Sequence, residues 1–223
     1  MTEQNQTAFS RLVSAITQQI EQARGQVRQA VNTAMVQSYW EIGRLIVEHE
    51  QQGNRRAEYG KQQLKQLSQQ LTERLGKGFD VTNLRNMRQF YHAFPIRDAV
   101  RLELSWTHYR PLLRIENAQA RDWYLHEAIN QSWSARALER QISTLYYERL
   151  LASQEKSSVA AEAQQNTQPL AESAKDYLRD PYILDFLNLQ DKTYQESQLE
   201  QAIISNLQQF LLEQWLHSKL STI

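Results

Sequence analysis

Residues that interrupt helices are rare in this chain, which has only 6 glycines and 4 prolines among its 223 residues. Helix-forming Gln, Leu, Ala, Glu and Arg are plentiful, and stretches of strict apolar and polar alternation are missing. Apolar residues instead recur at helical spacing, as Phe9, Leu12, Val13, Ile16 and Ile20 do near the N-terminus. The sequence therefore predicts an all-α protein built as a multi-helix bundle.

Breaks in the apolar pattern divide the chain into a series of expected helices. They are expected at residues 7–24, 25–50, 58–75, 80–94, 106–115, 117–129 and 132–151, with a break at Gly25 between the first two. Asp80 or Thr82 is expected to cap the helix that ends before Pro95. Gly76 and Gly78 are expected to be turn residues with positive φ, because the remaining positions of a phosphate loop are absent.

Composition suggests three segments. Residues 1–152 are expected to form a helical domain in which Trp106, Trp123 and Trp133 pack against other residues rather than stack on bases. Residues 153–172 are rich in Ser, Gln and Ala and lose the helical period, which predicts a linker. Residues 173–223 are expected to form a short C-terminal unit with a helix at about residues 195–212.

The sequence lacks the residues that several kinds of site and catalysis require. The chain has no cysteine, which excludes disulfides, Cys-ligated zinc and thiol catalysis. The five histidines form no metal-spaced pair, so no metal site is expected, and no Gly-x-Ser-x-Gly elbow occurs. No apolar run is long enough for a bilayer span, and the N-terminus lacks a signal core, so a cytoplasmic location is expected.

The net charge is zero, but the charge is unevenly distributed along the chain. Residues 74–114 contain eight basic and three acidic residues, a local excess of 8 − 3 = +5. The basic residues are Arg74, Lys77, Arg85, Arg88, Arg97, Arg101, Arg110 and Arg114. Such asymmetry is typical of a surface that binds a polyanion.

The expected helix at 80–94 separates its apolar and polar residues onto opposite sides. Leu84, Met87, Tyr91 and Phe94 gather on one side, which we expect to pack on the helix at 58–75. The candidate nucleic-acid contacts are Arg85, Arg88, Gln89 and His92 on the other side, with Asn83 and Asn86 flanking them and Arg74 and Lys77 on nearby phosphates. A helix, a glycine turn and a second helix also resemble a helix-turn-helix. The alternative is a solvated face on an ordinary bundle helix.

Five segments carry a resemblance to a known family. They are residues 59–61 (YGK), 78–91 (GFDVTNLRNMRQFY), 104–109 (LSWTHY), 133–142 (WSARALERQI) and 180–187 (DPYILDFL). In this order they resemble the YhcG-like family, in which domain of unknown function 1016 is fused to a PD-(D/E)xK nuclease domain. The resemblance covers about residues 9–212, almost the entire chain.

The resemblance implies that the helical region binds DNA or a partner molecule and that a C-terminal nuclease domain cleaves the DNA. In such nucleases carboxylates hold Mg²⁺, which activates water, and a lysine steadies the developing charge. Glu200 stands where the first nuclease helix of the family has its glutamate. After Glu213 the sequence departs from the family pattern, and the segments that would supply the aspartate and the lysine are missing. We therefore expect a truncated nuclease domain, no cofactor in this chain, and Mg²⁺ only in a full-length relative.

Three functions are compatible with these observations. The first is a double-stranded DNA-binding module of an endonuclease that is catalytically incomplete as it stands. The second is a module for protein–protein interaction or homo-oligomerisation in a restriction- or defence-type nuclease complex, because the early helices carry long apolar stripes. The third, an intact enzyme acting through another site, is the least supported function, because the sequence contains no recognisable set of catalytic residues.

Overall fold

The computed structural model describes residues 3–52, 57–96, 100–101, 103–170 and 180–186. Within these ranges every regular element is a helix and there is no strand, which confirms the all-α prediction. The helices are α1 (Glu3–Gln52), α2 (Ala57–Leu75), α3 (Val81–Ala93), α4 (Trp106–Leu112), α5 (Ala118–Asn130), α6 (Ala135–Ser143), α7 (Tyr146–Ala152), α8 (Lys156–Thr167), the 3-10 turn η2 (Gln168–Leu170) and α10 (Pro181–Phe186). In the described part of the chain, no helix has the length and apolar character needed to cross a bilayer.

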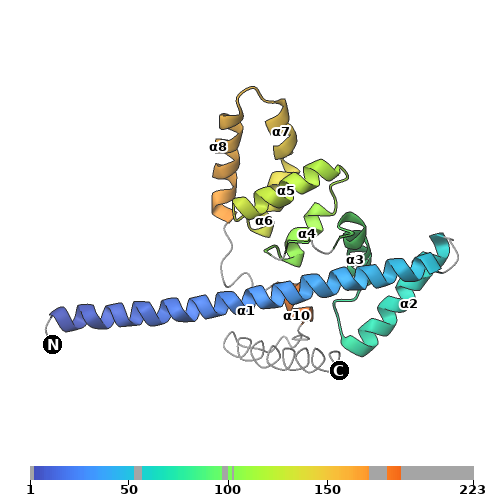
Figure 1. Ribbon diagram of the computed structural model, residues 1–223, viewed down its shortest axis with the longest axis horizontal. Helices are drawn as coiled ribbons and strands as arrows, with labels where there is room; N and C mark the ends of the chain where they lie inside the picture. The colour runs from blue at the N-terminus through green and yellow to red at the C-terminus, as the bar shows by residue number, and fades with distance from the viewer. Residues whose placement is uncertain (1–2, 53–56, 97–99, 102, 171–179, 187–223) are drawn as a thin grey trace.

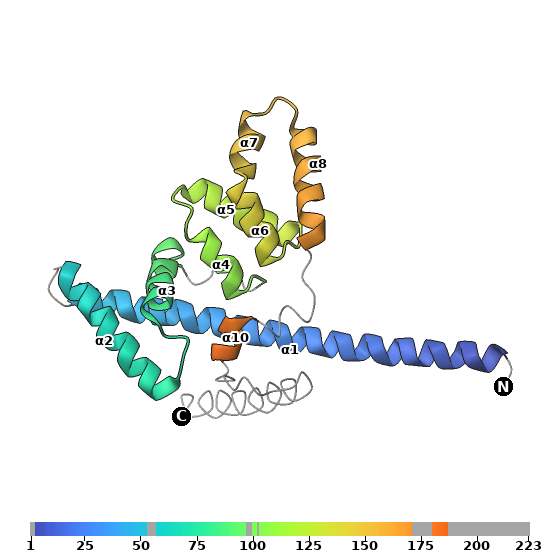
Figure 2. The ribbon, with the colours of Figure 1, turned by 180° about the vertical axis from the view of Figure 1, so that it is seen from behind.

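The first element, α1, is a single rod of 50 residues (Figure 1). The break expected at Gly25 is absent, so this prediction was wrong. A glycine inside a helix costs only about 1 kcal/mol relative to alanine, and good helix formers on both sides carry the helix through it. At 1.5 Å per residue the rod is about 75 Å long. Figures 1 and 2 both show its N-terminal half projecting beyond the other described helices.

The C-terminal half of α1 is the platform on which the body of the protein is built. Helices α3, α4 and α10 lie against it, and α2 contacts α3 (Figure 2). Aromatic rings fill the junction, where the Trp106 ring lies 5.0 Å from the Tyr39 ring and 5.4 Å from the Phe90 ring, both edge to face. The indole N–H of Trp40 donates to the Phe94 carbonyl at 2.7 Å, which ties the end of α3 to α1.

Helices α5 to α8 form a lobe on the side of the body that carries α4 (Figure 1). The helix expected at 132–151 is divided into α6 and α7, because Leu145 adopts a left-handed φ of 53°. Trp106 is fully buried, while Trp123 and Trp133 pack on the ring of Tyr146 at 5.5 and 6.0 Å. The prediction that these tryptophans serve packing is therefore confirmed.

The segment expected to be a linker is helical over much of its length. Helix α8 and η2 occupy residues 156–170, so the prediction of an irregular linker was wrong there. Ala163 is buried, and its carbonyl accepts a hydrogen bond from the Gln141 amide at 2.9 Å, which docks α8 on α6. Residues 171–179 and the expected helix at 195–212, including Glu200, lie outside the described residues. The division into a helical domain and a nuclease remnant stays a prediction.

Candidate nucleic-acid interface

Helix α3 begins after the glycine turn that the sequence predicts. Gly76 and Gly78 have φ values of 90° and 97°, in the left-handed region that favours glycine. Asp80 is the N-cap, and its carboxylate accepts hydrogen bonds from the backbone N–H groups of Thr82 at 2.8 Å and Asn83 at 3.1 Å. The positive φ values and the Asp80 cap are both confirmed, and together they fix where the helix starts.

The inner face of α3 is held chiefly by α1 rather than by α2. Leu84, Met87 and Phe90 are completely buried. The crossing with α1 is very close, because a Cβ added at Gly43 would lie 2.1 Å from the Met87 carbonyl oxygen. The Phe90 ring also packs on Tyr109 of α4, with ring centroids 4.6 Å apart. The predicted contact with the helix at 58–75 is present, but the larger contact of α3, with α1, was not predicted.

The outer face of α3 carries polar residues at helical spacing. Arg85, Gln89 and His92 are exposed, as is Thr82 one turn earlier. Their spacing of three, four and three residues places all four on one stripe of the helix. The expected separation of an apolar and a polar side is therefore confirmed for these positions. Thr82 was not predicted from the sequence, although its position three residues before Arg85 places it on the same side of the helix.

The two asparagines near the start of α3 occupy different environments. Asn83 is 2% exposed, its amide donates to the Gly78 carbonyl at 2.7 Å, and its oxygen accepts from the Trp106 indole N–H at 3.1 Å. The prediction that Asn83 flanks the outer face was wrong, because its side chain locks the glycine turn to the aromatic core. Asn86 is half-buried at the edge of the outer face.

Two of the expected contacts already have partners within the chain. Arg88 is half-buried, and its guanidinium forms an ion pair with Glu50 of α1 at 2.9 Å. The Gln89 amide nitrogen donates to the Leu113 carbonyl at 2.5 Å, at the end of α4. The outer face of α3 is thus bordered by the end of α1 on one side and by the end of α4 on the other. Sequence reasoning missed Glu50, and no local signal links it to Arg88.

The wider basic segment is not a single patch of free charge. Arg114 forms an ion pair with Glu139 at 3.0 Å, and Arg110 lies over the Tyr182 ring at 4.8 Å. Arg74 and Lys77 are exposed. Burial raises the pKa of Asp185 while the nearby charge of Lys77 lowers it, so Lys77 has an acidic neighbour. Arg97 lies outside the described residues. The cation that remains most open on α3 is Arg85, and His92 is exposed on the same stripe.

Comparison with known proteins identifies relatives of this chain. A family model described as DUF1016 N-terminal domain matches residues 15–149. The chain belongs to the DUF1016 family. It is 36% identical over 246 aligned positions to the "Putative nuclease YhcG" of Escherichia coli (strain K12), which confirms the YhcG-like resemblance. The alignment covers 96% of the chain and 64% of YhcG, so the chain spans slightly less than two thirds of that relative. No solved structure matches it.

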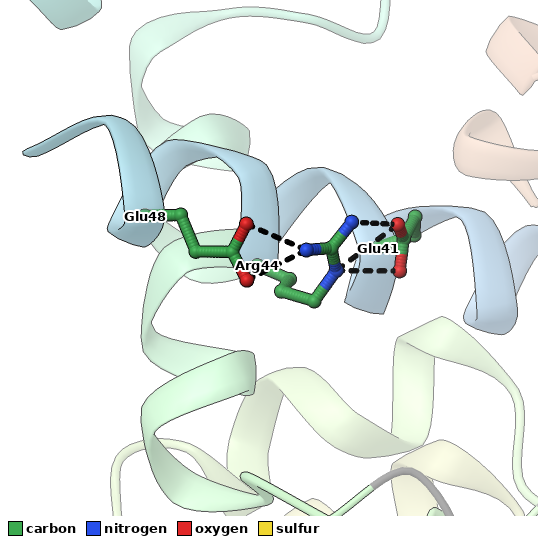
Figure 3. Close-up of polar contacts among 3 residues, drawn as sticks. All are labelled: Glu41, Arg44 and Glu48. Carbon is green, nitrogen blue, oxygen red and sulfur yellow. Dashed lines mark hydrogen bonds and ion pairs between the residues drawn. The ribbon is translucent and has the colours of Figure 1, made fainter. Parts of the chain in front are cut away.

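In this DUF1016 chain the end of α1 is rich in intrahelical ion pairs. Figure 3 shows Arg44 lying between Glu41 and Glu48. The Arg44 guanidinium donates to Glu41 at 3.0 Å and to Glu48 at 2.6 Å. The hydrogen bonds that Arg44 donates to Glu41 and then to Glu48 raise the pKa of Arg44 above its ordinary value. Because two carboxylates surround this guanidinium, Arg44 does not add an open positive charge to the surface that borders α3.

The histidine in the segment at 104–109 has a structural role. His108 is buried, and its Nδ1 accepts hydrogen bonds from the Ser105 hydroxyl at 2.7 Å and the Ser105 N–H at 3.3 Å. These partners assign the proton to Nε2, which donates to the Trp133 carbonyl at 3.0 Å. Burial lowers the pKa of His108, which favours the neutral form of the ring. In the residues that the structure describes, no three His, Cys, Asp or Glu side chains are grouped so as to hold a metal ion.

Proposed function

We propose that this DUF1016 chain is a nucleic-acid-binding helical region of a nuclease-type protein, and that α3 presents its outer face to duplex DNA. The observation that carries the proposal is the exposed stripe of Arg85, Gln89 and His92 on a helix whose opposite side buries Leu84, Met87 and Phe90 completely. The description of the relative YhcG as a nuclease supports nucleic acid as the ligand. A rigidly held helix with an open polar face is the element that DNA-binding modules place in the major groove.

Each exposed residue has a role that fits its chemistry. The guanidinium of Arg85 would take guanine O6 and N7 or a phosphate, and the Gln89 oxygen would accept from adenine N6 while its nitrogen remains on Leu113. His92 would contact phosphate at the far end of the stripe. Asn86 would contribute from the edge, and Arg88 would exchange Glu50 for a phosphate. Arg74 and Lys77 would lie on phosphates near the start of α3.

The order of α2, the glycine turn and α3 supports a helix-turn-helix-like mode of binding. In this mode the first helix crosses the backbone, and the N-terminal part of the second meets the base edges. Arg85 lies in that part of α3 and has the greatest reach among the exposed residues. We therefore assign Arg85 the central contact.

A mobility-shift titration with a pool of short duplexes tests the binding face. The Arg85→Ala/His92→Ala double variant is expected to bind roughly tenfold or more weakly than the wild type, because it removes an Arg contact and a phosphate contact. The matched control is Arg140→Ala/His126→Ala, which removes the same residue types from exposed positions on α6 and α5. Equal affinity of both double variants and the wild type would contradict the assignment of α3.

A further inference from the structure

The projecting half of α1 carries an unusual amount of exposed apolar surface. We call Phe9, Leu12, Val13, Ile16 and Ile20 the N-terminal stripe; their exposed fractions are 66%, 55%, 47%, 51% and 47%. Every residue from 9 to 24 is exposed. Contiguous apolar patches on soluble monomers are rare unless they bind something. An isolated helix of this length is also only marginally stable in water, so a partner along the stripe would supply the missing stabilisation.

The N-terminal stripe and the core side of α1 face in different directions. At about 100° per residue the five stripe residues fall within roughly 100° of the helix circumference. Most of the side that meets the body, marked by Met35, Tyr39 and Gly43, lies roughly a third of a turn away. Val27 and Val31, at the start of the buried half, fall in the same sector as the stripe and pack on the core. The stripe therefore runs into the buried side at Val27, and a partner can lie along residues 9–24, which are all exposed.

The spacing of the stripe indicates what kind of partner it fits. Phe9, Val13, Ile16 and Ile20 alternate in steps of four and three residues, the pattern of a coiled-coil seam, and Ala23 and Val27 continue it. In this register Val13, Ile20 and Val27 take the a positions, and Phe9, Ile16 and Ala23 take the d positions. Parallel two-stranded coiled coils typically have β-branched residues at a and residues that are not β-branched at d, and of the three d residues only Ile16 is β-branched. Val27 already packs partly against the core, so the free seam covers residues 9–24.

The charge along this half of α1 also suits pairing with itself. Residues 9–24 contain only Arg11, Glu21 and Arg24 as charged residues, and Glu21 and Arg24 form an ion pair at 3.0 Å. Arg11 points away from the seam, on the same side as Gln18 and Gln22. Two copies can therefore approach without like charges meeting at the seam. A strongly acidic or basic partner would find no matching charge here.

We propose that the N-terminal half of α1 pairs in parallel with the same half of a second copy of this chain, through the N-terminal stripe. The bodies would lie at the same end of the paired helices, on opposite sides of the seam. This surface lies apart from α3, so assembly does not require nucleic acid. Two α3 faces would then belong to one particle, as in DNA-binding proteins that engage two half-sites.

Light scattering on the full chain without nucleic acid tests the pairing. The wild type and the control variant Gln18→Asp/Gln22→Asp are expected to have the mass of a dimer. Val13→Asp/Ile20→Asp, which adds the same charge on the seam, is expected to have the mass of a monomer with its body still folded by near-ultraviolet circular dichroism. A wild type that stays monomeric at every concentration, or a seam variant that stays dimeric, would overturn the proposal.

Oxidative cross-linking tests the identity of the partner and its direction. Because the chain has no cysteine, Val13→Cys introduces a single thiol at an a position. A parallel pair brings Val13 of both copies together, so a disulfide-linked dimer is expected, while the control Gln18→Cys on the far side should link far less. If residues 187–223 of the same chain or an unrelated protein cover the stripe, Val13→Cys stays monomeric and the proposal fails. An antiparallel pair would also leave Val13→Cys unlinked and would overturn the proposed direction.

Discussion

The two halves of α1 belong to one unbroken helix but have opposite relations to the rest of the protein. In the C-terminal half, Met35, Tyr39 and Gly43 are buried beneath other helices. In the N-terminal half, residues 9–24 are all exposed, apolar side chains included. Helix propensity therefore builds the rod, while the presence or absence of neighbouring helices decides which residues stabilise the fold and which are left for assembly.

The largest contrast is expected from deleting apolar side chains in the two halves. Met35→Ala empties a completely buried position and should lower the free energy of unfolding by about 2–5 kcal/mol. Ile16→Ala, at a position that is 51% exposed, should cost less than about 1 kcal/mol in a dilute monomer. Chemical denaturation followed by far-ultraviolet circular dichroism measures both. Similar losses from the two variants would remove the distinction between the halves.

Replacing glycine with alanine should change the free energy of unfolding in opposite directions at the two glycines of α1. At Gly43 the added Cβ would lie 2.1 Å from the Met87 carbonyl oxygen and 3.2 Å from the Tyr91 Cβ, so α3 must move and stability should fall by roughly 1–3 kcal/mol. At Gly25 the nearest atom is 3.8 Å away, at the end of the Arg28 side chain. There the better helix propensity of alanine should raise stability by up to about 1 kcal/mol.

Thermal unfolding of Gly43→Ala and Gly25→Ala checks this pair, with the wild type beside them. The comparison is sharpened if only Gly43→Ala also weakens the near-ultraviolet signal of the aromatic residues around Trp106. A stabilising Gly43→Ala would show that α1 and α3 do not cross as closely as described.

A smaller difference should appear on acidification. Burial lowers the pKa of His108, so the unfolded chain, with a His pKa of about 6.5, takes up the proton more readily than the folded one. The contribution of the buried, neutral His108 to the stability of the fold is fully present above about pH 6.5 and is lost as the pH falls below that value. Residues 9–27 contain no histidine, so the projecting half should not share this dependence. Unfolding midpoints near pH 7.5 and pH 5.5 test it, and His108→Gln should show a smaller difference than the wild type.

The sequence predicted those features that depend on neighbours in the chain. The turn at Gly76 and Gly78 and the cap at Asp80 could be predicted, because each involves hydrogen bonds or backbone angles within a few residues. The exposure of Arg85, Gln89 and His92 on α3 followed from the helical period alone.

Features set by distant residues could not be predicted in this way. Asn83 turns inward because Trp106 offers it a hydrogen bond, and Arg88 is drawn to Glu50, 38 positions earlier in the chain. The contact of α3 with α1 depends on Gly43, because a side chain there would collide with Met87. This requirement is evident only from the crossing of the two helices. Helix α8 has a weak apolar period, and its position depends on the Gln141 amide and the buried Ala163.

The binding of duplex DNA by the outer face of α3 is tested most directly by fluorescence anisotropy with a labelled duplex over a series of salt concentrations. The logarithm of the affinity should fall linearly with the logarithm of the salt concentration for the wild type. Arg85→Ala should weaken binding and, if it removes one phosphate contact, reduce the slope by about 1. Coincident lines for Arg85→Ala and the wild type, or no binding at low salt, would contradict the account.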